Sequence, residues 1–309
     1  MPVDLGIYVP QIALSYDDLL VRARHCERLG FRSFWLFDHL YGPELPGLPA
    51  FEGWTLATSL LAHTETLRVG HLVLCNGFRH PAVLARMAST LDVISGGRLE
   101  LGLGTGSYQR EHVEAGLHWG TAAERSDLLR ESLEVITRML GPGPTTWSGR
   151  HFAVQDLPNL PLPSPRPRLL LGGVGPRYTL PLVARYADAW NVPTYGVARR
   201  AEAAAALERE CEQIGRDPAE IGRSLQLVMA VAADEASLPA VRALAERRYP
   251  GSAFALHDGG LVGTAEQVTE RLRAYIGEGW TEFALFLHDR GSVDTLELIA
   301  AEVAPYLET

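Results

Sequence analysis

Eight short apolar runs, each followed by a longer amphipathic segment, follow one another almost from end to end of this chain. The runs occupy residues 3–9, 33–37, 67–75, 98–103, 168–171, 189–192, 225–232 and 282–287. Short apolar runs are typical of strands buried on both faces, and apolar residues at three- and four-residue steps are typical of the helices that cover such strands. The pattern predicts an α/β fold, and it fits a closed (β/α)8 TIM barrel better than an open doubly wound sheet.

Residues 141–167, before the fifth strand, interrupt the alternation. They are rich in proline and glycine and contain the run TWSGRHFAV, in which Ser148–Gly149 could turn a small hairpin. Because the alternation resumes directly afterwards, we interpret these residues as a small excursion from the barrel and not as a linker. Hydrophobic residues make up 47% of the 309, which suffices for one large core, so we expect residues 1–309 to form a single domain.

Charge and cysteine content restrict the class of protein. The 37 acidic and 28 basic side chains give a net charge of −9 without a Lys/Arg cluster, whereas a nucleic-acid-binding surface needs concentrated positive charge. No apolar run approaches the ~20 residues that span a bilayer, and the amino terminus lacks the pattern of a signal peptide. The three cysteines, Cys26, Cys75 and Cys211, are too far apart for a disulfide framework or a metal knuckle. We therefore expect a cytoplasmic protein without nucleic-acid or membrane partners.

Several common motifs do not occur. GLGTGS at 102–107 and GGVGPRY at 172–178 fail as dinucleotide-binding fingerprints, because Ser107 and Tyr178 stand where the third glycine is required. The sequence has no P-loop, nucleophile elbow or H-E-x-x-H helix. His112, Glu114 and His118 lack the spacing of known metal ligands, so we interpret them as solvated surface and expect no metal.

Barrel enzymes keep their chemistry at the carboxyl ends of the strands, and polar residues follow two of the predicted strands. Asp38 and His39 come directly after the apolar run WLF of the second strand. His39 could transfer a proton near neutral pH while Asp38 sets its tautomer; alternatively, Asp38 caps the next loop and His39 packs against an aromatic ring. After the third strand, Asn76 could hydrogen-bond the polar edge of a planar heterocycle, or it could be a turn residue before Gly77.

Glycines follow the fourth and fifth strands. After the fourth, Thr105 and Gly106 would let a ligand approach the backbone closely, and Tyr108 could stack on a flat ring. After the fifth, backbone amides before a helix could bind the phosphate of a cofactor, although a tight turn without a ligand is the alternative. The residues of that second glycine-rich turn are Gly172, Gly173, Val174 and Gly175.

Four runs of the sequence resemble the bacterial luciferase-like flavin-dependent oxidoreductases, and in particular the branch that uses the deazaflavin coenzyme F-420. They are FWLFDHL (34–40), NGFRHPAVLARMASTLDVISGGRLELGLGTG (76–106), RPRLLLGGVGPRYTLPLVARYADAWN (166–191) and VGTAEQVTERLRAY (262–275). The runs lie in the order of the family and span most of the chain. The series HPA…LD…SGGR…LGLGTG is fairly specific.

The resemblance implies a TIM barrel with the cofactor ring in its mouth and the phosphate near the fifth strand. It also implies a non-prolyl cis peptide behind the ring, at Leu72–Val73 or one bond later. Asp38 and His39 match an Asp–His pair of F-420-dependent sugar-phosphate dehydrogenases, whose histidine is a proton acceptor or a ring contact. Those enzymes also carry a glutamate directly after the glycines of the fourth strand, where this sequence has Ser107.

We therefore expect an oxidoreductase that binds F-420 and transfers a hydride between C5 of the deazaflavin and a small organic substrate. His39 would donate or accept the proton with Asp38 as its orienter, and Asn76 and Thr105 would contact the ring. One alternative is an FMNH2-dependent monooxygenase, which would need a separate reductase as partner because the sequence has no NAD(P)H fingerprint. Another is a non-catalytic cofactor-binding homologue. The resemblance also implies a homodimer.

Overall fold

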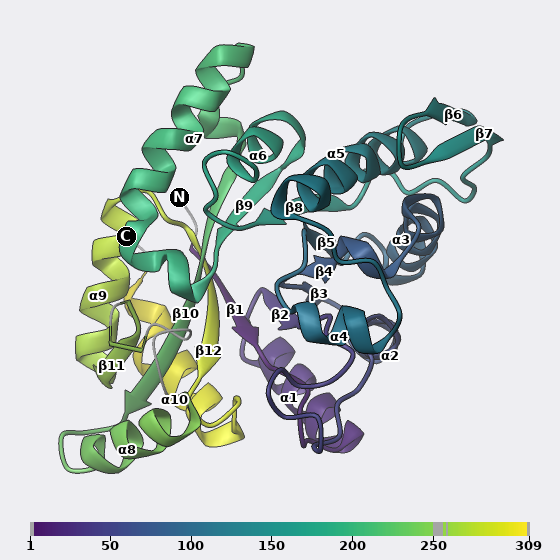
Figure 1. Cartoon of the computed structure of the whole chain (residues 1–309). Coiled ribbons are helices and arrows are strands. Elements are labelled where there is room, and N and C mark those ends of the chain that lie inside the picture. Colours follow the sequence, from purple (N-terminus) through teal and green to yellow (C-terminus); the bar gives the residue numbers. More distant parts are fainter. Residues whose placement is uncertain (1–2, 250–255, 258, 308–309) are drawn as a thin grey trace.

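The predicted strands form a closed parallel barrel in the computed structural model, which describes residues 3–249, 256–257 and 259–307 (Figure 1). In order around the barrel, they are β1 (Asp4–Tyr8), β2 (Ser33–Leu36), β3 (Arg68–His71) continued by β4 (Leu74–Cys75), β5 (Leu99–Gly104), β8 (Arg168–Gly172), β9 (Ala189–Val192), β10 (Gly222–Ala232) and β12 (Glu282–Leu287). The circle closes because β12 pairs with β1 and β9 pairs with β10. The predicted (β/α)8 barrel is confirmed.

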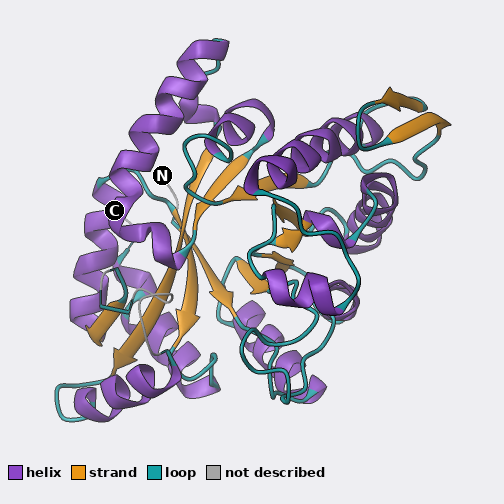
Figure 2. Cartoon of the chain, viewed as in Figure 1, coloured by secondary structure: helices purple, strands orange, loops and turns teal. Residues whose placement is uncertain are grey.

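Helices cover the outside of the barrel (Figure 2). They are α1 (Tyr16–Arg28), α2 (Gly53–Ala62), α3 (Pro81–Ser95), α5 (Ala122–Met139), α6 (Leu180–Tyr186), α7 (Arg200–Ile214), α8 (Leu238–Arg248), α9 (Ala265–Gly277) and α10 (Val293–Glu302). Short 3-10 helices are η1 (Asn76–Phe78), η2 (Thr194–Arg199), η3 (Pro218–Glu220) and η5 (Ala304–Tyr306). Local signals fix several ends: Thr264 forms the predicted capping box at the start of α9, and Gly96 ends α3 in a left-handed conformation. None of the helices in these described ranges combines the length and apolarity needed to cross a bilayer.

The alternation did not predict every element. The hairpin β6 (Thr145–Ser148) and β7 (Ala153–Leu157) is present in the excursion, as predicted, and projects from the barrel (Figure 1). In contrast, α4 (Gln109–Glu114) and the parallel strand β11 (Leu261–Thr264) are additional. β11 pairs with the last residues of the long strand β10, beyond the residues that pair with β9. This pairing joins segments that are distant in sequence, so the periodicity of the sequence does not predict it.

The two ends of the barrel differ in what fills them. Apolar side chains from the strands pack in its interior; they are Tyr8, Trp35, Phe37, Leu170, Ala189, Val228, Ala230, Ala284 and Phe286. At the amino end, Arg168 donates two hydrogen bonds to Glu282, and Arg68 pairs with the buried Glu100. Ion pairs therefore occupy the amino end, and the carboxyl end is left for a ligand, as is usual for this fold.

Candidate active site

A cavity lies at the carboxyl end of the barrel and brings together most of the predicted site residues. These are Asp38, His39, Leu72, Val73, Thr105, Gly106, Gly172 and Gly173. The remaining lining includes residues of strands, of the loop after β2, of α4 and of η2; they are Tyr8, Phe37, Cys75, Glu111, Asn191, Tyr195 and Gln226. Segments that are far apart in sequence thus meet at one opening, with the glycine-rich turns of β5 and β8 on the same cavity as His39.

An apolar part of the cavity lining depends on two glycines. Val73 follows a cis peptide bond, Leu72–Val73, at the position that the resemblance implies. A Cβ atom on Gly104 would lie 2.5 Å from Val73 Cγ2, and one on Gly172 would lie 2.9 Å from Val73 Cγ1. Both distances are well inside carbon–carbon contact. Glycine at these positions leaves room for Val73, which contributes an apolar part of the cavity lining together with Leu72.

The carboxylate of Asp38 holds two strand ends together. It is 5% exposed, and its two oxygens accept hydrogen bonds from both terminal nitrogens of Arg79 at 2.7 and 2.8 Å. One oxygen also accepts from the Cys75 N–H at 2.8 Å, and Arg79 reaches Glu52 at 2.7 Å. A bidentate guanidinium–carboxylate pair is geometrically specific. Asp38 therefore ties the end of β2 to the connection between β4 and α3.

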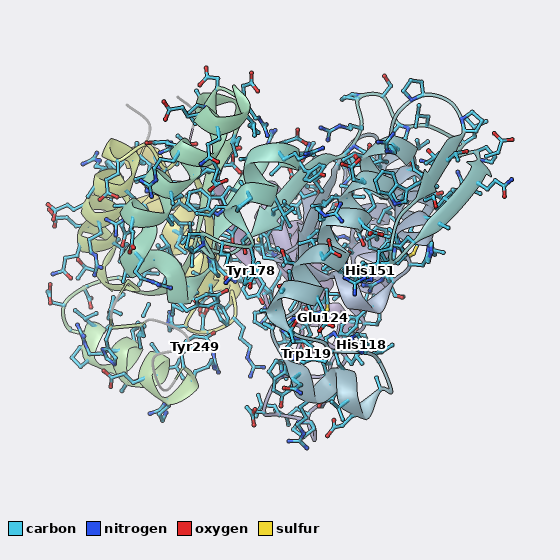
Figure 3. The ribbon with its side chains drawn as sticks, turned by 45° about the horizontal axis from the view of Figure 1, so that its top comes forward. His118, Trp119, Glu124, His151, Tyr178 and Tyr249 are labelled. Carbon is cyan, nitrogen blue, oxygen red and sulfur yellow. The ribbon has the colours of Figure 1, made fainter. Side chains whose placement is uncertain are left out.

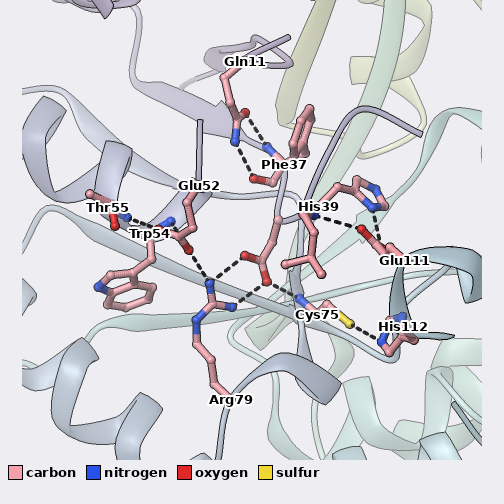
Figure 4. A network of polar contacts seen from close by, with 12 residues as sticks. Gln11, Phe37, His39, Glu52, Trp54, Thr55, Cys75, Arg79, Glu111 and His112 are labelled. Atoms are coloured by element: carbon pink, nitrogen blue, oxygen red, sulfur yellow. Dashed lines mark hydrogen bonds and ion pairs between the residues drawn. The ribbon is translucent and has the colours of Figure 1, made fainter. Parts of the chain in front are cut away.

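The imidazole of His39 is paired with Glu111 (Figure 4). We expected Asp38 to set the tautomer of His39, but the hydrogen bonds of Asp38 go to Arg79 and Cys75, and the expected role of Asp38 is not supported. Instead, Glu111 Oε1 lies 2.8 Å from His39 Nδ1, and Glu111 Oε2 accepts from the Leu40 N–H at 2.9 Å.

This contact fixes the chemistry of the ring. The Glu111 side chain is 1% exposed, so its carboxylate acts on His39 with little screening by solvent. A carboxylate can only accept, so His39 Nδ1 carries a hydrogen and Nε2 is the nitrogen that can exchange a proton. An imidazole that is oriented in this way and lines a cavity is typical of general acid–base catalysis.

Another histidine, His112, is buried and contacts Cys75. The Cys75 Sγ atom lies 3.3 Å from His112 Nε2, and His112 Nδ1 lies 3.1 Å from the Tyr108 carbonyl oxygen. Nδ1 must donate to that carbonyl, so Nε2 accepts from the thiol. Burial raises the pKa of Cys75 to about 12, which keeps the thiol neutral and argues against a nucleophile. His112 is 1% exposed, so our interpretation of it as solvated surface was wrong.

Two predicted contacts lie apart from this cavity. Asn76, in η1, is 4% exposed and faces a second cavity, which also contains His112. Tyr108 stands at the rim, where its hydroxyl donates to Glu44 at 3.1 Å and its ring lies edge-on to His39. Neither side chain lines the cavity that contains His39.

The glycine-rich turn after β8 contributes only its first half to the cavity. Gly172 and Gly173 line it, whereas Val174 and Gly175 lie outside its lining. The Gly173 N–H donates to the Asn191 carbonyl at 3.0 Å. We expected free backbone N–H groups in this turn, but the N–H of Gly173 already donates a hydrogen bond within the fold.

The helix after this turn begins at Leu180, with Thr179 as its N-cap residue. The Thr179 side chain lies against the glycines: Thr179 Oγ1 lies 3.3 Å from a Cβ placed on Gly173 and 3.2 Å from one placed on Gly175. A hydroxyl beside two glycines is a donor that could contact a phosphate.

Sequence reasoning missed Glu111. It lies 72 residues from His39, on the six-residue helix α4, whose pattern is too short to show a periodicity. The only available signal was its position soon after the glycines of the fourth strand, where the resemblance calls for a carboxylate. Glu111 supplies a carboxylate to this part of the mouth although Ser107 does not.

Comparison with known proteins gives the following similarities. A sequence profile described as luciferase-like monooxygenase matches residues 3–282. An F420-dependent hydroxymycolic acid dehydrogenase of Mycobacterium tuberculosis is 29% identical over 236 residues, which are 75% of this chain and 64% of that protein. An F420-dependent glucose-6-phosphate dehydrogenase of Microbacterium testaceum is 31% identical over 191 residues, which are 62% of this chain and 56% of that protein. The matched parts thus span less than two thirds of these relatives.

Solved structures share the fold at low identity. An F420-dependent secondary alcohol dehydrogenase in complex with an F420–acetone adduct superposes with a TM-score of 0.84 at 20% identity and covers 100% of both chains. EDTA monooxygenase from Chelativorans superposes with a TM-score of 0.84 at 17% identity and covers 99% of this chain and 94% of that one.

Proposed function

The chain belongs to the luciferase-like monooxygenase family of oxidoreductases, and we propose that it uses coenzyme F-420 to transfer a hydride to or from a small organic substrate. The observation that carries the proposal is the His39–Glu111 pair in the lining of a cavity that Leu72 and Val73 also line. The names of the two dehydrogenase relatives support F-420 over FMN.

The residues of the cavity fit a flat redox ring. Leu72 and Val73 offer an apolar surface, and the glycines beside it add no side chain that would obstruct a ring. The Thr179 hydroxyl beside Gly173 would hold the phosphate. When bound, the deazaflavin supplies the two-electron chemistry, accepting or donating a hydride at C5, and the protein supplies orientation and proton transfer.

His39 is the residue that we assign to proton transfer. Glu111 orients the ring through Nδ1, so His39 Nε2 would give a proton to, or take one from, an oxygen of the substrate as the hydride moves. Asp38 has a structural role instead, because through Arg79 it keeps the ends of β2 and β4 in register, which holds the histidine at the opening.

Cofactor titration followed by turnover tests the proposal. We expect saturable binding of F-420 by the purified chain, followed by optical changes and turnover with members of a panel of secondary alcohols and ketones. His39→Gln should still bind F-420 but turn over about 10²-fold more slowly. His63→Gln, which changes an exposed histidine on the outside of the barrel, is the matched control. Unchanged turnover in His39→Gln would remove this residue from the mechanism.

The competing function is an FMNH2-dependent monooxygenase that works with a separate flavin reductase. It is favoured by Ser107, which stands where the resemblance to F-420-dependent sugar-phosphate dehydrogenases calls for a glutamate, and by the similarity to a pyrimidine monooxygenase, RutA of Escherichia coli, at 31% identity over 175 residues. That match covers 54% of this chain and 47% of RutA. Tight binding of FMN together with no binding of F-420 would replace the proposed function with this one.

A further inference from the structure

Tyr195 lies on the side of the barrel mouth opposite His39. It belongs to the 3-10 helix η2, which follows β9, and it lines the cavity that contains His39. His39 follows β2. Around the barrel, β3, β5 and β8 separate β2 from β9 on one side, and β1, β12 and β10 separate them on the other. A molecule that reaches His39 Nε2 across this cavity therefore has Tyr195 on its far side.

The backbone that carries Tyr195 is packed tightly, although its side chain is largely uncovered. A Cβ on the next residue, Gly196, would lie 2.7 Å from Val174 Cγ1 and 3.1 Å from Val192 Cγ1, so η2 packs closely against the turn after β8 and against β9. Tyr195 is nevertheless 58% exposed. An aromatic ring on a fixed backbone offers a large apolar contact surface at a low cost in conformational entropy. Its exposure beside a cavity is typical of a ligand contact.

The charges in the lining of this cavity disfavour an anionic substrate. The chain has no lysine, and among the described residues no arginine lines the cavity; the parts of the chain outside the described ranges contain no arginine either. The lining does contain two carboxylates: that of Asp38, which is paired with Arg79, and that of Glu111. A phosphate or carboxylate held between His39 and Tyr195 would therefore meet no permanent positive charge, and burying it there would be costly.

Aromatic side chains also line the cavity between these two sides. Tyr8 and Phe37 belong to the lining. Tyr8 packs edge-on against Phe286 with 5.0 Å between the ring centroids, and Tyr249, which is labelled in Figure 3, packs against the same ring at 4.5 Å. Because these rings support one another, Tyr8 is a fixed part of the lining. Aromatic surroundings without a cation suit a flat apolar group.

We propose that the substrate is an uncharged secondary alcohol or ketone with a flat apolar substituent, such as an aryl ring, and that Tyr195 contacts this substituent. The inference rests on the proposed function, because it places the alcohol or carbonyl oxygen at His39 Nε2. The substituent then extends across the mouth to Tyr195. Burial of part of the Tyr195 side chain raises the pKa of its phenol, which stays neutral at neutral pH and presents an uncharged ring.

Titrations with methyl ketones that differ in one property each test the substrate class. Dissociation constants of acetophenone, acetone and 4-acetylbenzoate are measured by ligand-detected NMR on the chain loaded with cofactor. Acetone lacks the ring of acetophenone, and 4-acetylbenzoate adds a carboxylate to it. We expect acetophenone to bind about tenfold more tightly than either. Equal binding of acetone would overturn the apolar contact. Tighter binding of 4-acetylbenzoate would overturn the uncharged substrate and indicate Arg199, which acts electrostatically on Tyr195 from the same helix.

Variants of Tyr195 test the contact itself. Tyr195→Ala should weaken the binding of acetophenone about tenfold and change that of acetone little, because only the aryl ring loses a contact. Tyr195→Phe keeps the ring and should restore the affinity of the wild type. Tyr306→Ala is the matched control, since Tyr306 is 52% exposed in η5 and lies outside the lining of the mouth. Equal acetophenone affinity in the wild type and Tyr195→Ala would overturn the proposal. Thermal unfolding confirms that each variant is folded; if Tyr195→Ala does not fold, Tyr195→Leu replaces it.

Failure of this inference is distinguishable from failure of the proposed function. If F-420 does not bind, the proposed function fails, and the same titrations on the chain loaded with FMN still test Tyr195. If F-420 binds and ketones are turned over while acetophenone binds equally well without the Tyr195 ring, the proposed function stands and the inference fails. In turnover, Tyr195→Ala should raise KM for acetophenone more than it lowers kcat, and the pH profile should keep its shape because His39 is unchanged.

Discussion

Replacing Glu111 with glutamine should release the imidazole of His39 from its fixed tautomer. In the wild type, one carboxylate oxygen accepts from His39 Nδ1 at 2.8 Å and the other accepts from the Leu40 N–H at 2.9 Å. Glutamine keeps one acceptor oxygen and replaces the other with an NH2 donor, so one of these two donors loses its partner. A hydrogen bond to a charged group contributes about 1.5–3 kcal/mol, and we expect Glu111→Gln to lower the free energy of unfolding by that amount.

The tautomer itself can be observed without a substrate. Nitrogen-15 NMR of the histidine side chains, at a pH where the ring of His39 is neutral, should show the hydrogen on Nδ1 in the wild type. In Glu111→Gln we expect a mixture or the Nε2–H form. Glu114→Gln is the matched control on the same helix, since Glu114 contacts Tyr41 and Arg110 and not His39. Identical tautomers in the wild type and Glu111→Gln would refute the role that we assign to this carboxylate.

Three further variants test the cavity and its supports. Arg79→Leu should lower the free energy of unfolding by about 3–5 kcal/mol because it leaves the buried Asp38 carboxylate unpaired, and adding Asp38→Asn should restore part of that loss in urea titrations; no recovery would contradict the pairing. Burial alone would raise the pKa of Glu131, but hydrogen bonds from the backbone N–H groups of residues 150–152 lower it. A carboxyl group whose pKa is lowered by folding contributes its full stabilisation only above its unfolded pKa of about 4.3. Glu131→Gln should therefore lower the free energy of unfolding by about 1.5–3 kcal/mol at pH 7 and by progressively less as the pH falls below about 4. A loss that does not change with pH would contradict this role of the Glu131 carboxylate. Gly172→Val should crowd the cavity lining, lowering stability by about 1–3 kcal/mol and abolishing F-420 binding in a fluorescence titration, whereas unchanged binding would place the ring elsewhere.

The barrel could be predicted because its strands and helices are encoded locally. Apolar runs and amphipathic segments carry their own periodicity, and caps such as Thr264 mark their ends. The strand β11 could not be predicted in this way: its four residues pair with the far end of β10, about thirty positions earlier, and nothing in the run LVGT distinguishes it from a loop. Pairing between distant segments is a property of the folded chain and leaves no local pattern.

The candidate site was predictable in position but only partly in detail. The fold brings the carboxyl ends of all strands to one opening, so polar residues after a strand, such as His39, could be placed there from sequence. Their partners could not. The Glu111 carboxylate reaches His39 from 72 residues away, and Arg79 takes the Asp38 carboxylate from 41 residues away. Adjacency in sequence favoured Asp38 as the partner of His39, whereas side-chain packing around the mouth decides otherwise.

A crystal structure of the chain with coenzyme F-420 tests most directly whether the barrel mouth holds the redox ring. We expect density for the deazaflavin against Leu72 and Val73, with His39 on the wall of the same cavity and the phosphate beside Gly173 and Thr179. Well-defined cofactor density on another surface, with the mouth closed by side chains, would contradict this placement.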